Sequence, residues 1–230
     1  MLLKKYNLSD LTKTIFLFII YFFCNKLLIV FFDRIGINNY ILISFVADLI
    51  FLLISFLLYK KEIITDFNNI NSNYKLKDIL KTIFKYLFFL FLINFIISVI
   101  ANILLVNVEE LNSIQNLVNE STIYLVFKSL IFSPLAETLL FQKSTRKIIH
   151  NNFIYIFLSA VTFTLINMIY MDLNSQYFVF DVIGYFIMTL IFCYIYVKTD
   201  NIFFVVFIKF LYNLIPLMAN IILLMEVLWW

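Results

Sequence analysis

Residues 86–106 read YLFFLFLINFIISVIANILLV and contain no charged side chain over 21 positions. A transmembrane α-helix needs about 20 predominantly apolar residues to cross the hydrocarbon core of a bilayer, so this stretch is long enough to span a membrane. Six further stretches have similar length and apolarity, at residues 14–32, 41–59, 123–142, 153–171, 178–197 and 202–225. The sequence therefore predicts an all-α integral membrane protein with about seven transmembrane helices.

The composition excludes a soluble globular protein. Of the 230 residues, 64% are hydrophobic and 13% are charged, and the mean hydropathy is +1.01. A soluble domain is typically about half apolar and about a quarter charged. The 29 Phe and 14 Tyr suit contact with lipid tails and with the aromatic belts of membrane interfaces. A composition heavy in Asn, Ile, Lys and Phe is typical of AT-rich bacterial genomes.

The basic residues predict the orientation in the membrane. Thirteen of the 17 Lys and Arg residues fall before the first predicted span or in alternate loops after it, one falls in the opposite loops, and three lie within spans. Loops rich in Lys and Arg stay on the cytoplasmic side. We expect a multi-pass protein of the cell membrane with a cytoplasmic N-terminus and a C-terminus outside.

No linker or internal repeat interrupts the chain, so we expect one structural unit with two regions. Residues 1–122 form an N-terminal three-helix membrane region, which ends in a polar outer loop at 107–122 whose apolar spacing predicts an amphipathic helix. Residues 123–230 form a four-helix membrane core. Residues 60–85, which are basic and rich in Asn, are expected to be a long solvated loop.

Charged residues within the spans call for partners, because a charge at mid-span costs about 2.5–3.5 kcal/mol on insertion scales. Lys26 and Asp48 lie at similar depth on neighbouring spans and are predicted to pair. Glu137 and Lys209 both lie roughly 8–10 Å from the cytoplasmic ends of their spans at about 1.5 Å per residue. We predict that they form a buried ion pair, and that they face one cavity open to the cytoplasm together with Asn167 and Asn213.

Several chemistries have no support in the sequence. There is no His-Glu-x-x-His motif and no cluster of Cys and His, so we expect no metal site and no cofactor. The two glycines cannot build a phosphate-binding loop. Cys24 and Cys193 lie in apolar runs and are expected to be buried free thiols. The net charge of +3 is explained by the cytoplasmic loops, so we expect no nucleic-acid partner.

Three segments in the last four spans place polar residues among apolar ones. Residues 133–142 read SPLAETLLFQ, residues 163–167 read FTLIN, and residues 199–213 read TDNIFFVVFIKFLYN. Lys209 and Asn213 are four residues apart and share one helix face. Together the segments resemble the CPBP family of membrane proteins, also called Abi, which includes CAAX prenyl endopeptidases and bacteriocin-processing or self-immunity proteins.

The resemblance rests on three motifs in the same order. The family has a Pro followed by Glu-Glu-x-x-x-Arg, then Phe-x-x-x-His, then His-x-x-x-Asn downstream of a turn like Thr-Gly-Ser. The resemblance covers residues 130–214. The residues that match are Pro134, Glu137, Phe141, Phe163, Thr199 and Asn213.

The departures from the motifs concern the catalytic positions. In the family, the first glutamate activates water while two histidines orient the water and stabilise the developing oxyanion. Here Asn167 and Lys209 replace the two histidines, and neither titrates near neutral pH in the way a proton shuttle requires. Thr138 and Gln142 replace the second glutamate and the arginine. The resemblance therefore implies a degenerate catalytic site at Glu137, Asn167, Lys209 and Asn213.

Three functions remain open at this point. The first is a non-catalytic protein that binds a membrane protein or peptide partner in the bilayer, as in bacteriocin self-immunity or envelope scaffolding. The second is an active intramembrane glutamic endopeptidase that processes a prenylated protein or a peptide leader, with Glu137 as the base. The third is a channel or transporter that uses the buried charges, although the paired repeats with broken helices that are typical of transporters are missing.

Overall fold

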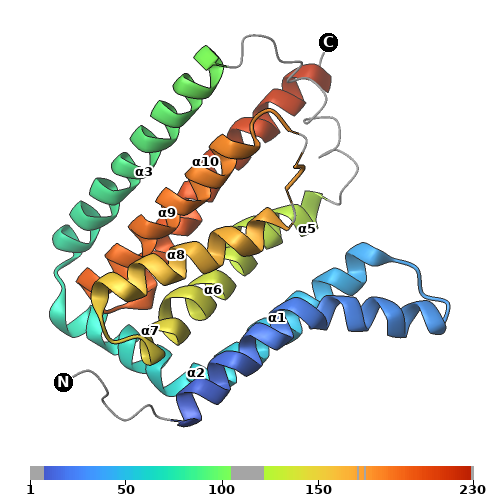
Figure 1. Cartoon of the computed structure of the whole chain (residues 1–230), viewed down its shortest axis with the longest axis horizontal. Coiled ribbons are helices and arrows are strands. Elements are labelled where there is room, and N and C mark those ends of the chain that lie inside the picture. The colour runs from blue at the N-terminus through green and yellow to red at the C-terminus, as the bar shows by residue number, and fades with distance from the viewer. Residues whose placement is uncertain (1–7, 105–121, 170, 174, 229–230) are drawn as a thin grey trace.

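The computed structural model describes residues 8–104, 122–169, 171–173 and 175–228, and over these ranges it contains helices and no strand. The predicted amphipathic helix at 107–122 lies almost wholly outside the described residues. The helices, shown in Figure 1, are α1 (Leu8–Arg34), α2 (Tyr40–Asn73), α3 (Leu76–Leu104), α5 (Thr122–Phe127), η1 (Lys128–Phe132), α6 (Ser133–Glu137), η2 (Thr138–Ser144), α7 (Thr145–Ile148), α8 (Asn152–Met168), α9 (Phe178–Thr199) and α10 (Ile202–Leu228).

The predicted fold class is confirmed. Among the described residues, six helical segments are long and apolar enough to cross a membrane: α1, α2, α3, the continuous rod from α5 to α7, α9 and α10. The remaining predicted span, at 153–171, corresponds to α8, an apolar helix of 17 residues. At about 1.5 Å per residue it is roughly 25 Å long, at the lower limit for a crossing.

The prediction of a long solvated loop at residues 60–85 is wrong. Helix α2 kinks at Tyr59, where φ is −114° and ψ is 17°, and then continues to Asn73, while α3 begins at Leu76. The reason is that Ile63, Asp66 and Ile70 recur at helical spacing and turn toward the protein, where the two isoleucines pack against the buried core and Asp66 is itself buried. A basic, Asn-rich composition concealed an amphipathic helix.

The start of α1, the junction of α2 and α3, helix α7 and the junction of α9 and α10 lie together at one end of the molecule (Figure 1). We call it the basic end, because these segments carry most of the Lys and Arg residues. Lys147 on α7 forms ion pairs with Asp10 on α1 and with Glu62 on α2. The Tyr74 hydroxyl, between α2 and α3, donates to the Thr199 carbonyl at the end of α9, at 3.2 Å. The helices therefore alternate in direction as the predicted spans do, and the cytoplasmic location of this end remains a prediction.

The ion pair predicted between Lys26 and Asp48 does not form in the described part of the chain. Asp48 instead accepts a hydrogen bond of 3.0 Å from the Tyr124 hydroxyl on α5. Lys26 is exposed and lies on the same face of α1 as Phe23 and Val30, which are 54% and 53% exposed. The two charges share a depth, but α1 turns the lysine away from the protein.

Candidate functional site

The rod from α5 to α7 is interrupted by two π-helical segments, η1 and η2, which flank the five residues of α6. Such π turns occur often at functional sites. At the end of η1 the Ser133 N–H donates to the Lys128 carbonyl, five residues back. In the same register the next amide would serve the Ser129 carbonyl, but residue 134 is a proline and has no N–H. The backbone therefore leaves the Ser129 carbonyl without its helical donor.

Asn213 supplies the missing donor. Its side-chain Nδ2 on α10 donates to the Ser129 carbonyl at 2.8 Å. Since an unpaired carbonyl inside a membrane protein is costly, this bond ties α10 to the interruption created by Pro134. The asparagine of the third motif thus binds the carbonyl that the proline of the first motif leaves without a backbone donor.

Glu137 and Lys209 form the predicted buried ion pair. Lys209 Nζ lies 2.9 Å from Glu137 Oε2, and the side chains are 4% and 19% exposed. The other carboxylate oxygen, Oε1, accepts a hydrogen bond from the Ser133 hydroxyl one turn earlier. Both oxygens of Glu137 are therefore engaged by protein groups.

Two aromatic rings enclose the Lys209 ammonium group. Its Nζ lies 5.5 Å from the ring centroid of Phe163 on α8 and 4.9 Å from that of Phe192 on α9. A cation over an aromatic face is attracted by the ring quadrupole, most strongly where water is excluded. Phe163, the aromatic residue of the second motif, thus helps to hold the lysine.

Asn167 does not hydrogen-bond to Glu137 or Lys209. Its Nδ2 donates to the Phe163 carbonyl at 2.9 Å, within its own helix. Of the four residues singled out in the sequence, Glu137 and Lys209 meet directly. Asn213 binds the backbone at Ser129, eight residues before the glutamate, and the Asn167 side chain binds the backbone of its own helix, α8.

The two other departures from the motifs leave buried oxygens unpaired. Thr138 and Gln142 are both 0% exposed. Within the described residues, Thr138 Oγ1 and Gln142 Oε1 have no hydrogen-bond partner, while Gln142 Nε2 makes one weak contact of 3.9 Å with Cys193 Sγ. Unsatisfied buried polar atoms are rare in folded proteins. Both unpaired oxygens belong to residues that depart from the first motif of the family.

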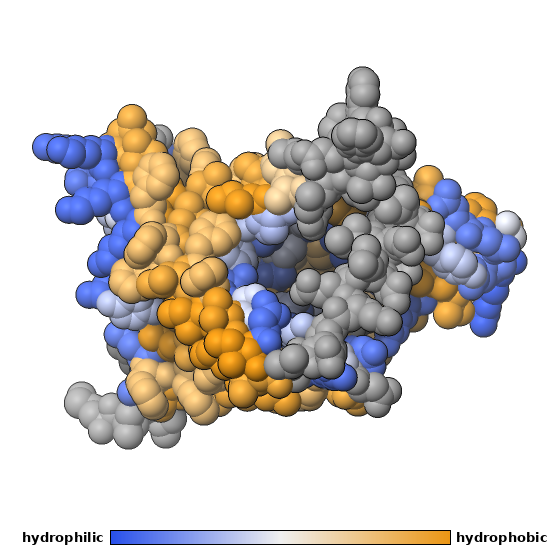
Figure 2. Space-filling model, turned by 90° about the horizontal axis from the view of Figure 1, so that it is seen from above, coloured by the Kyte–Doolittle hydropathy of each residue, from blue (hydrophilic) through white to orange (hydrophobic). Residues whose placement is uncertain are grey.

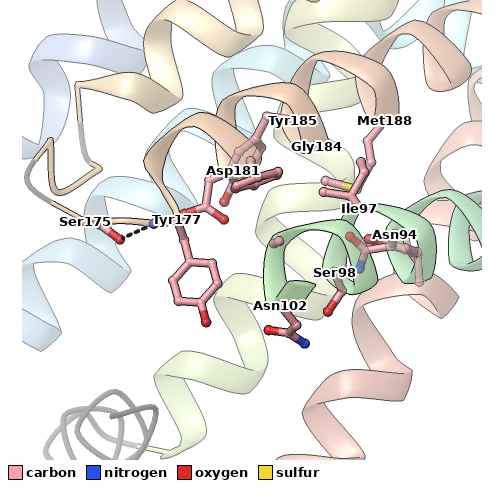
Figure 3. Close-up of a pocket in the computed structure, with 13 residues that line it drawn as sticks. Asn94, Ile97, Ser98, Asn102, Ser175, Tyr177, Asp181, Gly184, Tyr185 and Met188 are labelled. Atoms are coloured by element: carbon pink, nitrogen blue, oxygen red, sulfur yellow. Dashed lines mark hydrogen bonds between the residues drawn. The ribbon is translucent and has the colours of Figure 1, made fainter. Parts of the chain in front are cut away.

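A cavity of about 660 Å³ lies between α3, α9 and α10, and none of the four predicted site residues lines it (Figure 3). It lies toward the end of the molecule away from the basic end, and it differs from the cavity that we expected around those four residues. Its α3 wall carries Asn94, Ser98 and Asn102. These three residues were not among the predicted site residues, although their spacing of four in an otherwise apolar span was a usable signal.

The two side chains that contact the Glu137 carboxylate, Ser133 and Lys209, both donate hydrogen bonds to it. An ammonium group donates hydrogen bonds and accepts none, so Lys209 cannot orient water as a neutral imidazole would. Both asparagine amides that the resemblance assigns to the site donate to backbone carbonyls. In the described residues, no histidine lies near the carboxylate, since the single one, His150, is exposed between α7 and α8.

A comparison with family models supports the resemblance to the CPBP family. Residues 119–215 match the model described as type II CAAX prenyl endopeptidase Rce1-like. Comparison with curated proteins and with solved structures found no match. The matched segment contains helix α6 with its flanking π-helical segments, the Glu137–Lys209 pair and Asn213. The chain is therefore a multi-pass, all-helical membrane protein that, over residues 119–215, is similar to the Rce1-like type II CAAX prenyl endopeptidases.

Proposed function

We propose that this CAAX-protease-like protein does not hydrolyse peptides, and that it binds a peptide or protein partner in the bacterial cell membrane. Self-immunity to a bacteriocin and scaffolding of an envelope protein are the two roles of this kind. The observation that supports the proposal is the occupation of both Glu137 carboxylate oxygens, one by Ser133 and one by Lys209.

Hydrolysis by a glutamate needs a carboxylate that accepts a proton from water and a second group that stabilises the oxyanion. Because Lys209 already holds one oxygen of the Glu137 carboxylate and Ser133 the other, water must displace one of them before the carboxylate can accept its proton. Opening the pair to admit water would leave two buried charges uncompensated, at a cost of about 3–5 kcal/mol for breaking such a pair from one side. The ground state of this site therefore opposes the first step of the reaction.

The test uses the purified full chain reconstituted in lipid vesicles with a farnesylated peptide that ends in a CAAX sequence. We expect no release of the C-terminal tripeptide above that from empty vesicles, while an active CAAX endopeptidase in the same vesicles releases it. Cleavage by the wild-type chain that disappears in Glu137→Gln would overturn the proposal. The protein would then be an intramembrane glutamic endopeptidase with Glu137 as base.

The kind of partner is tested separately. A gene for a small peptide precursor beside this one would favour immunity or peptide maturation, whereas an isolated locus would favour a scaffold. In the first case, deletion of the gene should sensitise the cells to the mature peptide. If the role is binding, the double variant Glu137→Gln/Lys209→Met should still protect the deletion strain, because it keeps the shape of the site without its charges. Protection by the wild-type chain alone would indicate that the carboxylate itself acts.

A further inference from the structure

Helix α3 carries a polar stripe inside a membrane-spanning segment. Asn94, Ser98 and Asn102 are four residues apart and therefore lie on one face of the helix. All three are exposed, and within the described residues none of them makes a side-chain hydrogen bond. Hydrocarbon cannot satisfy amide and hydroxyl groups. This face of α3 therefore borders water or a polar ligand rather than lipid tails.

The stripe faces α9 across the cavity of about 660 Å³. Figure 3 shows Asn94, Ser98 and Asn102 on one side, and Tyr177, Asp181 and Tyr185 on the other. Seen from above, the molecule has a hollow in which hydrophilic side chains are visible between apolar ones (Figure 2). The volume is within the range of about 300–1,000 Å³ that is typical of ligand pockets.

The cavity has a negative charge without a counter-ion. Among the described residues that line it, Asp181 is the one acidic side chain, and none is Lys, Arg or His. Asp181 forms no ion pair within the part of the chain that the structure describes, and its side chain is exposed to the cavity. The first-turn amides of α9 stabilise the carboxylate to some extent, but they carry no net charge. An anionic ligand is excluded and a cationic one is favoured.

The remaining walls suit a cation as well. Tyr177, Tyr185 and Tyr212 line the cavity, and aromatic faces attract ammonium and guanidinium groups. Asn94 and Asn102 offer uncharged donors and acceptors that match a peptide backbone. A lone ammonium ion would fill a small part of the volume, whereas a short peptide with one basic residue would fill most of it.

We propose that this cavity binds a cationic peptide, whose ammonium or guanidinium group lies beside Asp181 between the tyrosine rings while its backbone meets the polar stripe of α3. The site is separate from Glu137, and the proposal holds whether or not that residue hydrolyses a bond. It assigns the ligand to the end of the protein away from the basic loops.

The charge of the cavity is tested with thiol reagents on the full chain in detergent, in a background in which Cys24 and Cys193 are replaced by Ser. Ser98→Cys places a thiol in the cavity, and the neighbouring Val99→Cys is the control outside it. The probes are trimethylammonium-ethyl and sulfonato-ethyl methanethiosulfonate, with rates normalised to a free thiol. We expect the cationic reagent to be favoured about tenfold at Ser98→Cys through the charge of Asp181, and not at Val99→Cys.

Substitution of Asp181 decides the source of this selectivity. Asp181→Asn should abolish the preference at Ser98→Cys, and Asp181→Glu should keep it. Because the carboxylate has no partner to lose, both variants are expected to fold, which size-exclusion chromatography checks. Equal normalised rates for the two reagents, or a preference that survives Asp181→Asn, would overturn the proposal.

The ligand class is tested by protection of Ser98→Cys from modification. The probe is an N-acetylated tripeptide amide with a central lysine between two leucines, compared with the same peptide carrying an acetylated lysine. We expect the first to slow modification and the second to have no effect. Protection by both peptides or by neither contradicts the proposal. Equal protection by tetramethylammonium at the same concentration would assign the site to a small cation instead of a peptide.

Discussion

Two buried lysines form almost the same ion pair in two different settings. At the basic end, Lys143 Nζ on η2 lies 2.8 Å from Asp66 Oδ2 on α2, with side chains 10% and 7% exposed. Within the bundle, Lys209 Nζ lies 2.9 Å from Glu137 Oε2, with side chains 4% and 19% exposed. The distances alone do not tell the two pairs apart.

The surroundings of the carboxylates differ. Asp66 Oδ2 also accepts the first-turn N–H of α10 from Ile202 at 3.3 Å, and the Asp66 carbonyl accepts from Asn201 Nδ2 at 2.6 Å. This pair joins α2, η2 and α10, three segments far apart in the sequence. Glu137 receives from another helix only the Lys209 ammonium, beside the hydroxyl of Ser133 in its own helix. The pair of Lys143 and Asp66 connects three segments of the fold. The pair of Lys209 and Glu137 engages the carboxylate that the resemblance places at the catalytic position of the family.

The largest effect is expected at the inner pair. Lys209→Met should lower the free energy of unfolding by about 3–5 kcal/mol, because Glu137 stays buried without a partner. The double variant Glu137→Gln/Lys209→Met should be clearly more stable than Lys209→Met. Denaturant titration in detergent micelles measures both. Equal stability of the single and double variants would mean that the pair is not coupled.

The pair at the basic end should be somewhat less costly to break. Asp66→Asn should destabilise the protein by about 2–3 kcal/mol, since it removes the charge of the ion pair but keeps a side-chain oxygen that can still accept hydrogen bonds from Lys143 and from the Ile202 N–H. It should also loosen the second part of α2, measured as faster protease cleavage between residues 60 and 75. If cleavage is unchanged while stability falls, the pair does not hold this segment.

The bond between Asn213 and the Ser129 carbonyl should contribute less. Asn213→Ala leaves that carbonyl unpaired and should cost about 1–3 kcal/mol. In a Pro134→Ala background the new N–H of residue 134 can serve the carbonyl, so the same substitution should cost less than half as much. A double-mutant cycle measures this coupling, and additive effects would contradict the role assigned to Asn213.

The smallest effect is expected at the partly exposed pair of Lys147 and Glu62, whose side chains are 22% and 26% exposed. Glu62→Gln should change the free energy of unfolding by less than about 1 kcal/mol. Salt screens exposed charges, so the difference from wild type should shrink at high ionic strength. A change as large as that of Asp66→Asn, insensitive to salt, would show that exposure does not separate the two pairs.

The predicted topology is measured by reporters rather than by stability. A reporter enzyme that works only outside the cytoplasm should be active when it is fused after α10, and a reporter that works only in the cytoplasm should be inactive there. The reason is that thirteen of the 17 basic residues precede the first span or lie in alternate loops, which are expected to be cytoplasmic. Activity of the cytoplasmic reporter at that position would show that the orientation is opposite to the predicted one. The cavity lined by Asp181 would then lie toward the cytoplasmic side.

The sequence by itself determined the membrane class, the positions of the apolar helices, and the pair of Glu137 and Lys209. Apolar length decides whether a segment spans a bilayer, and it can be counted along the chain. The pair followed because two opposite charges at the same depth each need a partner. The motifs added the resemblance to the CPBP family, which the family match over residues 119–215 confirmed.

Only the tertiary structure decided which way each helix turns its polar residues. Lys26 and Asp48 share a depth as Glu137 and Lys209 do, yet α1 directs Lys26 outward and Tyr124 takes its place beside Asp48. The role of Asn213 depends on the π register before Pro134, which residue types do not specify. The cavity between α3 and α9 exists because those helices stand apart where the polar stripe faces inward. Depth is a property of position in the sequence, whereas rotation and spacing are set by packing against neighbouring helices.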